Sequence, residues 1–178
     1  MRVVIDTETT GFGHMGRPPR VDAIVQVGIA WRDPRGALMT WESLCNPGAW
    51  YLDEADPKAL EVNGLTREQL EAAPDIRDVS LKLRLLLESF GTLKLHSYNM
   101  AFDRPFLSAG PWYVEEELWG ECIMLKATQG NERWPKLKVA AERAGINLEG
   151  RRLHSAGEDA AIALEVMEWL EAPSRTLP

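Results

Sequence analysis

The sequence has few cysteines, no long apolar run and no excess of positive charge. Its two cysteines, Cys45 and Cys122, lie far apart and outside any C-x-x-C spacing, which argues against a zinc site and against a disulfide framework. No apolar run approaches the ~18 residues that a membrane-spanning helix needs. The first residues contain no apolar stretch of signal-peptide length. These absences predict a cytoplasmic protein with reduced thiols and no membrane contact.

Positive charge is scarce, because 20 lysines and arginines stand against 27 aspartates and glutamates, for a formal net charge of −7. Such a chain is not an obvious nucleic-acid binder, since phosphate contacts need positive charge. Residues 126–152 reverse the balance, with seven basic and three acidic residues. This local excess is compatible with a polyanion contact and equally with a solvated helix face.

The length of 178 residues and an apolar fraction of 45% predict a single globular domain over residues 1–178. Short apolar runs predict strands at 2–6, 24–31, 37–44, 92–96 and 120–125, the last either a strand or a strand running into a helix. Helical spacing predicts short pieces within 61–73 and helices at 75–90, 102–109, 136–144 and 158–171, whereas 46–57 resembles a loop. Three early strands, followed by helices that alternate with strands, predict an α/β fold: a mixed sheet flanked by helices.

Two acids, Asp6 and Glu8, stand at the end of the first strand. Residues two apart on a strand point to the same side, so these carboxylates are aimed together. They repel each other unless a cation lies between them, and Mg²⁺ is bound by carboxylate oxygens. On this pair alone, two solvated acids at an exposed strand end are the simpler interpretation.

Further acids stand at two predicted helix starts. Asp103 follows the fourth strand, where capping alone explains an acid, although sites also gather at the ends of adjacent strands. Ser155 and Glu158 predict a capping box for the last helix, which leaves Asp159 in its first turn. His154, just before this helix, is either an exposed loop residue or a base that titrates near neutrality.

In their order and spacing, these residues resemble the DEDDh type of the DnaQ-like exonucleases, from residue 3 to about residue 170. The matching residues are Asp6, Glu8, Asp103, Asp159 and His154. The segments 64–66, 99–103 and 137–146 also resemble family segments. The sequence departs from the family at Tyr98 and Asn63, where a histidine is frequent, but neither position supplies a metal ligand.

This resemblance implies an RNase H-like mixed five-stranded sheet with an antiparallel second strand. It also implies 3′-to-5′ removal of nucleotides from single-stranded ends with two Mg²⁺ or Mn²⁺ ions. Asp6 would bridge both ions, Glu8 and Asp159 would hold one, and Asp103 would act on the other through water. His154 would take the proton from the attacking water.

The resemblance also implies a set of substrate-binding residues: Thr9, Thr10, Gly11, Phe12 and Asn99. Phe12 would stack on the terminal base, although core packing is nearly as good an explanation. Arg17 and Arg20 lie in a glycine- and proline-rich loop. They are expected to keep that loop soluble rather than to contact the backbone of a nucleic-acid strand.

DNA is the first choice of polymer, because the segments around Gly64 and Leu137 resemble the proofreading branch, and a DNA polymerase is then the candidate partner. An oligoribonuclease-like or RNA-trimming enzyme is the alternative within the same class. From other classes, a non-catalytic nucleic-acid or polymerase-binding module is disfavoured by the complete set of acids. An RNase H-type endonuclease would not need the spacing between His154 and Asp159.

Overall fold

The computed structural model describes residues 1–12, 22–130 and 133–172. Arg17 and Arg20 lie outside these described residues. The strands are β1 (Arg2–Thr9), β2 (Ile24–Arg32), β3 (Leu38–Leu44), β4 (Lys94–Ser97) and β5 (Trp119–Cys122). The helices are α1 (Ala49–Asp53), α2 (Pro57–Asn63), α3 (Arg67–Glu71), α4 (Ile76–Ser89), α5 (Met100–Leu107), α6 (Ile123–Ala127), α7 (Leu137–Arg143) and α8 (Ala156–Glu171), with a short 3₁₀ turn, η1 (Glu116–Leu118).

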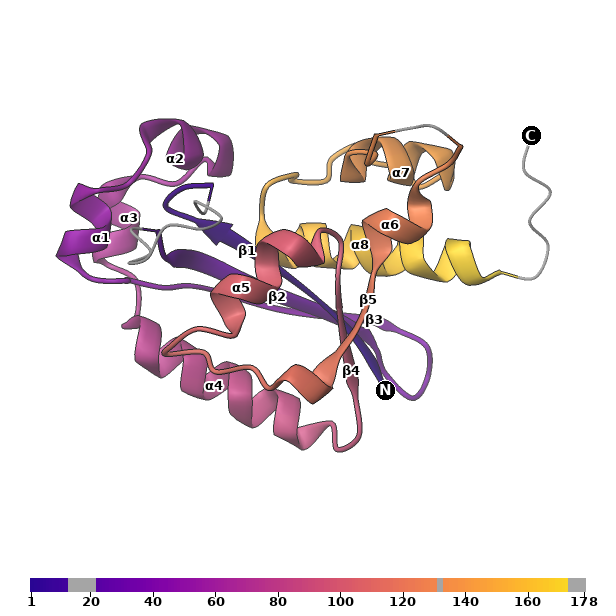
Figure 1. Ribbon diagram of the computed structural model, residues 1–178, viewed down its shortest axis with the longest axis horizontal. Coiled ribbons are helices and arrows are strands. Elements are labelled where there is room, and N and C mark those ends of the chain that lie inside the picture. The colour runs from indigo at the N-terminus through magenta and orange to yellow at the C-terminus, as the bar shows by residue number, and fades with distance from the viewer. Residues whose placement is uncertain (13–21, 131–132, 173–178) are drawn as a thin grey trace.

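The strands form one mixed sheet in the order β3-β2-β1-β4-β5, with β1 at its centre (Figure 1). β2 runs antiparallel to both β1 and β3, whereas β4 runs parallel to β1 and to β5. The predicted five-stranded mixed sheet with an antiparallel second strand is therefore confirmed. β1 and most of β2 are buried, because their near-continuous apolar runs lie in the middle of the sheet between helices.

Helices cover both faces of the sheet, and alternate residues of β1 point to one layer or the other. Val3 and Ile5 belong to the apolar cluster that includes the buried side of α4. Val4 belongs to a second cluster, formed with α6, α7 and α8. Asp6 and Glu8 follow Val4 at even spacing, so they lie on the α8 side of the sheet.

Small residues bring the start of α8 against the middle of the sheet. A Cβ on Gly28 would lie 2.2 Å from backbone atoms of Ala156 and Gly157, so no larger residue fits at this position of β2. Gly28 pairs with Asp6 of β1 on one side and with Glu42 of β3 on the other. The first turn of α8 therefore lies over Gly28, between Asp6 of β1 and Glu42 of β3.

The predicted helices at 75–90, 102–109, 136–144 and 158–171 correspond to α4, α5, α7 and α8, each within two residues at either end. The short pieces within 61–73 are the end of α2 and all of α3, separated by Gly64, whose φ of 65° ends α2. The loop predicted at 46–57 is wrong in part, because it contains α1. That helix forms where Leu52 is buried with Val25 and Leu70, a tertiary contact that the local sequence does not reveal.

The cysteines and the lengths of the helices can be described from the structure. Cys45 is a buried free thiol and Cys122 is a partly buried one. Within the described ranges, no helix has the length and apolar character needed to cross a membrane.

Candidate active site

β1 supplies the first two acids of the site, Asp6 and Glu8. They lie on one side of the strand, opposite Gly28 and Gln26 of β2. Glu8 is only 9% exposed, so its carboxylate is not the solvated group of an open strand end. The simpler interpretation, two solvated acids, is therefore wrong for Glu8.

α5 supplies Asp103, which is 2% exposed and lies one turn inside the helix. Its Oδ1 accepts hydrogen bonds from the backbone N–H of Thr7 at 3.1 Å and from Thr7 Oγ1 at 2.7 Å. Its Oδ2 accepts one from Ser97 Oγ, at the end of β4. Asp103 does not cap α5, because the capping position belongs to Asn99 and the carboxylate is turned onto β1 and β4 instead.

The capping box predicted at the start of α8 is wrong. The hydroxyl of Ser155 donates to Glu42 Oε2 at 2.8 Å, and Glu158 pairs with Arg151 instead of reaching back to the helix start. Glu42 Oε2 also accepts from the backbone N–H of Gly157 at 3.1 Å. A carboxylate from the neighbouring strand thus takes over the capping role, and its charge suits the positive end of the helix dipole.

A second strand residue completes this anchor. Gln26 Oε1, on β2, accepts a hydrogen bond from the backbone N–H of Ala156 at 3.1 Å. Together, Gln26 and Glu42 fix where α8 begins and therefore where its first turn places Asp159. A polar residue inside the apolar run of β2 was a sequence signal for Gln26, whereas nothing local distinguishes Glu42.

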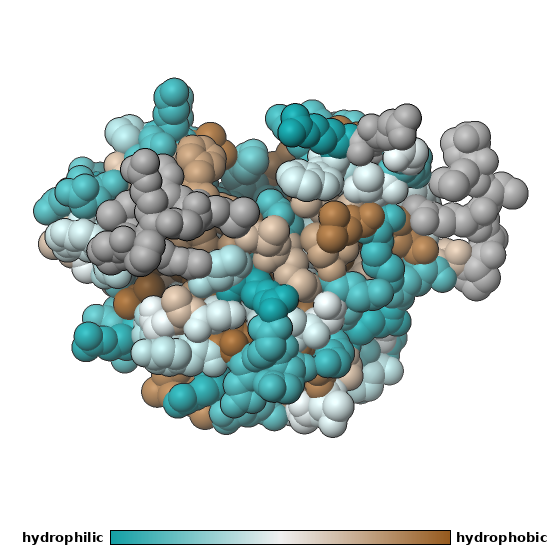
Figure 2. All heavy atoms as spheres, viewed as in Figure 1, coloured by the Kyte–Doolittle hydropathy of each residue, from teal (hydrophilic) through white to brown (hydrophobic). Residues whose placement is uncertain are grey.

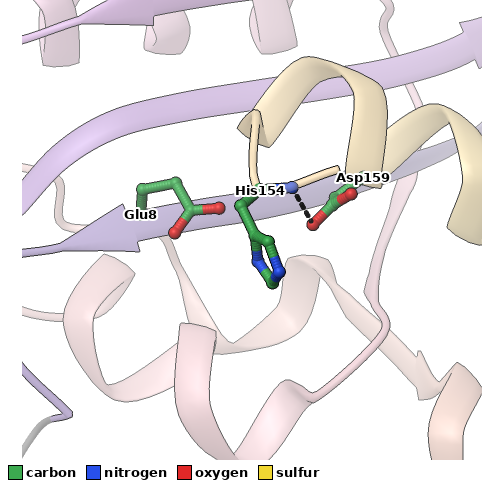
Figure 3. A group of neighbouring side chains, drawn as sticks. All are labelled: Glu8, His154 and Asp159. Atoms are coloured by element: carbon green, nitrogen blue, oxygen red, sulfur yellow. Dashed lines mark hydrogen bonds between the residues drawn. The ribbon is translucent and has the colours of Figure 1, made fainter. Parts of the chain in front are cut away.

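Asp159 and His154 lie on either side of the start of α8. Asp159 Oδ2 accepts a hydrogen bond from the backbone N–H of His154 at 3.3 Å. The side chain of His154 is exposed, and its backbone has a φ of 62°. Metal-binding atoms of Glu8, His154 and Asp159 all lie within 4.8 Å of one another. Figure 3 shows the imidazole beside the two carboxylates, at the end of the loop that enters α8.

Crowding of the acids in a buried place raises their pKa values. Burial, with repulsion from Asp159 and Asp103, raises the pKa of Glu8 to about 8. Burial, then repulsion from Asp103, Glu8 and Asp159, holds the pKa of Asp6 well above its usual value. Burial also raises the pKa of Asp159. The fully ionised cluster is therefore unfavourable by itself, and a bound cation would stabilise it.

Asp103 differs from the other acids because hydrogen bonds offset part of the cost of burying its charged carboxylate. Burial raises its pKa to about 6, while the hydrogen bonds from Ser97 and Thr7 oppose this rise. Asp159 has no comparable compensation at one oxygen, because its buried Oδ1 has no hydrogen-bond partner among the described residues. An unpartnered buried carboxylate oxygen beside other carboxylates fits a metal ligand, and oxygen donors suit Mg²⁺ or Mn²⁺.

The acid cluster opens onto a groove of about 1440 Å³. Phe12, Asn99, His154 and Asp159 line this groove, together with residues of α5, α6 and the segment before α7. Figure 2 shows apolar surface over α6 on this face of the molecule, and a mixture of apolar and hydrophilic side chains over α5. A buried acid cluster that opens onto a long groove can hold a cation against an extended substrate.

Comparison with known proteins identifies the fold and the family. The profile of the RNase_T exonuclease family matches residues 3–167. The chain belongs to this family of exonucleases. DNA polymerase III subunit epsilon of Haemophilus influenzae is 25% identical over an alignment of 175 residues that covers 93% of this chain and 65% of that subunit. The chain therefore spans just under two thirds of the length of this relative.

Solved structures share the fold of this exonuclease at low sequence identity. Exonuclease X, in complex with 5′-overhanging duplex DNA, has a TM-score of 0.66 and 21% identity, covering 99% of this chain and 95% of its own. The nuclease domain of 3′hExo, a DEDDh family member bound to rAMP, has a TM-score of 0.68 and 19% identity, covering 94% and 90%. The predicted resemblance to the DnaQ-like, DEDDh exonucleases of the RNase H-like superfamily is confirmed.

The residues predicted to bind substrate fall into two groups in the exonuclease. Thr9 and Thr10 are buried, and Thr10 Oγ1 accepts a hydrogen bond from the N–H of Ala23 at 2.9 Å, so their side chains support the turn after β1. Phe12 is 64% exposed and lines the groove, which excludes the core-packing explanation. Asn99 also lines the groove.

Gly11 lies close to the side chain of Asp22, which would have to move if a larger residue replaced the glycine. A Cβ there would lie 2.1 Å from Asp22 Oδ1. Asn63, one of the departures from the family pattern, donates from Nδ2 to the carbonyl of Thr9 at 3.1 Å. Tyr98, the other departure, donates from its hydroxyl to the carbonyl of Pro135 at 2.7 Å. Asn63 therefore holds the end of β1, and Tyr98 holds the segment before α7, which lines the groove; their sequence positions did not reveal these roles.

Proposed function

We propose that residues 1–178 form a single exonuclease domain that removes nucleotides stepwise from the 3′ end of single-stranded DNA, using two Mg²⁺ or Mn²⁺ ions. The observation that carries this proposal is that Glu8, His154 and Asp159 meet at the groove, with Asp6 and Asp103 near enough to repel their charges. Membership in the exonuclease family supports cleavage at a chain end.

The acids would hold the cations, which when bound would neutralise charge on the phosphodiester and activate a water. We assign Asp6 to both ions, because it lies beside Glu8 on the α8 side of β1 and each of the other three acids is close enough to raise its pKa. Glu8 and Asp159 are assigned to one ion, and the unpartnered Oδ1 of Asp159 supports this role. Asp103 is assigned to the second ion through water, because protein donors already occupy both of its oxygens.

His154 is assigned as the base that accepts the proton of the attacking water at a ring nitrogen. The exposed ring is free to meet a water above the cluster, and the adjacent backbone N–H is fixed to Asp159. The backbone of Gly11 and the exposed ring of Phe12 would position the terminal nucleotide. Stacking on such a ring contributes about 1–3 kcal/mol per base.

The polymer and the partner are the finer parts of the proposal. DNA is favoured because the Haemophilus influenzae relative is a DNA polymerase III subunit, and by the same likeness a DNA polymerase is the proposed partner. An RNA-trimming enzyme is the alternative, since the 3′hExo neighbour holds rAMP. The free thiols of Cys45 and Cys122 favour the proposed cytoplasmic location.

A digestion time course tests this proposal. DNA and RNA oligomers of one sequence, labelled at the 5′ end, are incubated with Mg²⁺, Mn²⁺, Ca²⁺ or chelator. We expect a ladder of shortened DNA products with Mg²⁺ or Mn²⁺, little turnover with Ca²⁺ and none in chelator, because the looser coordination of Ca²⁺ positions groups poorly. Faster shortening of RNA would select the alternative polymer.

Two substrate controls separate end attack from internal cutting. A bulky group on the 3′ end should slow digestion strongly, whereas the same group on the 5′ end should not. A circular single strand should stay intact. Cleavage of the circle, or undiminished activity in chelator, would contradict the proposed reaction. Polymerase partnership has a separate readout, namely co-elution of the purified exonuclease with a replicative polymerase subunit.

A further inference from the structure

The groove extends beyond the acid cluster along a wall to which no role has been assigned. This wall is formed by α6 and by the segment before α7, including Leu125 and Trp134. Trp134 is 63% exposed and Leu125 is 58% exposed, although both are large apolar residues. Exposed apolar side chains gathered on one groove mark a binding surface more often than a solvated one.

The backbone around Trp134 holds the indole on the groove. Trp134 has a φ of 27°, in the region that bulky residues rarely adopt. The next residue, Pro135, is buried, and its carbonyl accepts the hydrogen bond from Tyr98 described above. The exposed ring is therefore attached to an anchored backbone, which lowers the entropic cost of stacking against it.

Charge around the indole favours an anionic ligand. Lys136 and Lys138 are exposed, line the same groove and belong to the segment 126–152 that reverses the acidic balance of the chain. Lys138 Nζ lies 4.0 Å from Glu142 Oε1 and both side chains are exposed, so this ion pair is weak. Planar apolar surface interleaved with positive charge suits the bases and phosphates of a single strand.

We propose that Trp134 is a stacking site for a base upstream of the 3′-terminal nucleotide, with Leu125 beside it and with Lys136 and Lys138 contacting phosphates. The inference rests on the proposed function, because it extends the strand from Phe12 and the acid cluster along the same groove. It assigns strand-length preference to Trp134: oligomers that reach the indole are bound more tightly than short ones, whereas hydrolysis of a lone nucleotide ester does not depend on it.

Two substrates separate this subsite from the chemistry. The p-nitrophenyl ester of thymidine 5′-phosphate reports hydrolysis at the acid cluster without an upstream strand. Oligothymidylates of two to eight nucleotides measure how strongly the groove binds strands of increasing length. For Trp134→Ala we expect KM for the octamer to rise about 5- to 150-fold, the equivalent of one lost stack. The rate with the p-nitrophenyl ester should stay unchanged, and the advantage of the octamer over the dimer should shrink.

Matched variants show whether stacking is the cause. Trp134→Phe should keep most of the length preference, because a ring remains. Trp50→Ala removes a tryptophan of similar exposure, 52%, on α1 outside the groove and should behave as the wild type. Lys136→Gln with Lys138→Gln should weaken octamer binding and lower its salt dependence, since phosphate contacts release counterions.

Binding of a fluorescent octamer in Ca²⁺, measured by anisotropy, gives a readout that needs no turnover. Equal dissociation constants for the wild type and Trp134→Ala would overturn the stacking site while leaving the proposed function intact. If Trp134→Ala does not fold, the Lys136 and Lys138 substitutions test the same wall, and unchanged binding there overturns it. A wild-type protein that neither binds the octamer nor hydrolyses the ester would overturn both proposals.

Discussion

The α4 layer and the α8 layer pack against the same central strand with different side chains. Towards α4, β1 presents Val3 and Ile5, and Leu83 and Leu87 of the helix are buried in the same apolar cluster. Towards α8, small residues are mixed with the aliphatic ones: Gly28 lies in the sheet, and α8 buries alanines beside Ile162 and Leu164. The same face of β1 continues into Asp6 and Glu8.

Because of this difference, the α4 layer contributes mainly to the stability of the fold, whereas the α8 layer positions the acids of the site. Large aliphatic side chains on the α4 side remove much apolar area from water, and that burial stabilises the fold. Small residues on the α8 side let the helix backbone approach the sheet closely, and this approach brings Asp159 to Asp6 and Glu8. The acids then raise one another's pKa, so the face that carries the site stabilises the fold less than its packing alone would.

The largest expected effect is the loss of activity when the cluster is broken. Asp6→Asn should lower the exonuclease rate at least about 10³-fold, because charge stabilisation at the reacting phosphate is lost. In chelator, the variant should melt at or above the wild-type temperature, since a repelling charge is gone. Ladder assays and thermal melts in chelator measure the two quantities together.

Two counterparts sharpen this result. Asp78→Asn changes an exposed acid in the first turn of α4; it should leave the rate unchanged and should not raise the melting temperature, because a first-turn acid favours the helix. Leu83→Ala, in the α4 layer, should instead lower the free energy of unfolding by about 2–5 kcal/mol while the folded enzyme stays active. An active Asp6→Asn enzyme would show that this acid holds no essential ion.

The next effect concerns His154. His154→Ala should reduce turnover about 10²- to 10⁴-fold, the usual contribution of a positioned acid–base group, while strand binding is kept. Only the neutral imidazole accepts a proton, so the pH dependence of the rate should differ between the wild type and the variant. Single-turnover rates across pH measure it. An unchanged rate and pH profile would assign the proton transfer to another group.

A smaller effect concerns the pH dependence of stability without metal. Burial and repulsion raise the pKa of Glu8 from 4.5 to about 8 in the folded protein. A carboxyl group with a raised pKa favours folding while it is protonated, and this contribution is lost as the pH rises through the folded value. The metal-free protein should therefore lose on the order of a few kcal/mol of stability between about pH 5 and about pH 9.

Thermal melts in chelator across this range check that expectation. Mg²⁺ should restore more stability at high pH than at low pH, because it binds the ionised acids. Glu8→Gln should flatten the decline, whereas Glu61→Gln, an exposed acid on α2, should not. Stability that increases with pH in chelator would mean that the acids are not crowded in solution as they are in this structure.

The smallest expected effect lies at the anchor of α8. Glu42→Gln keeps one acceptor for Ser155 and Gly157 but loses the charge at the helix start, so we expect a loss of about 0.5–2 kcal/mol, the usual range for a helix cap. Activity should fall several-fold below the melting temperature, because Asp159 is less firmly placed. Melting curves and rates at low temperature separate the two losses. Full activity with lower stability would make the anchor purely structural.

Much of the fold was predictable, because its signals are local. The apolar runs of β1 and β2, and the helical spacing of α4 and α8, determine those elements wherever they pack. α1 was missed, because a five-residue helix is held by Leu52 in a distant cluster rather than by its own sequence. The capping box was wrong for a similar reason, since Glu42 is remote in sequence and displaces the local partner.

The sequence by itself determined which residues carry charge and in what order they occur, and that order is enough to indicate the family. The tertiary structure decided how the charges meet. Asp103 turns onto Thr7 and Ser97, while Asp159 keeps an oxygen without a partner among the described residues, and both outcomes depend on strands far away in the chain. Burial and mutual repulsion act through space, so the raised pKa values of the acids exist only once β1, α5 and α8 are packed together.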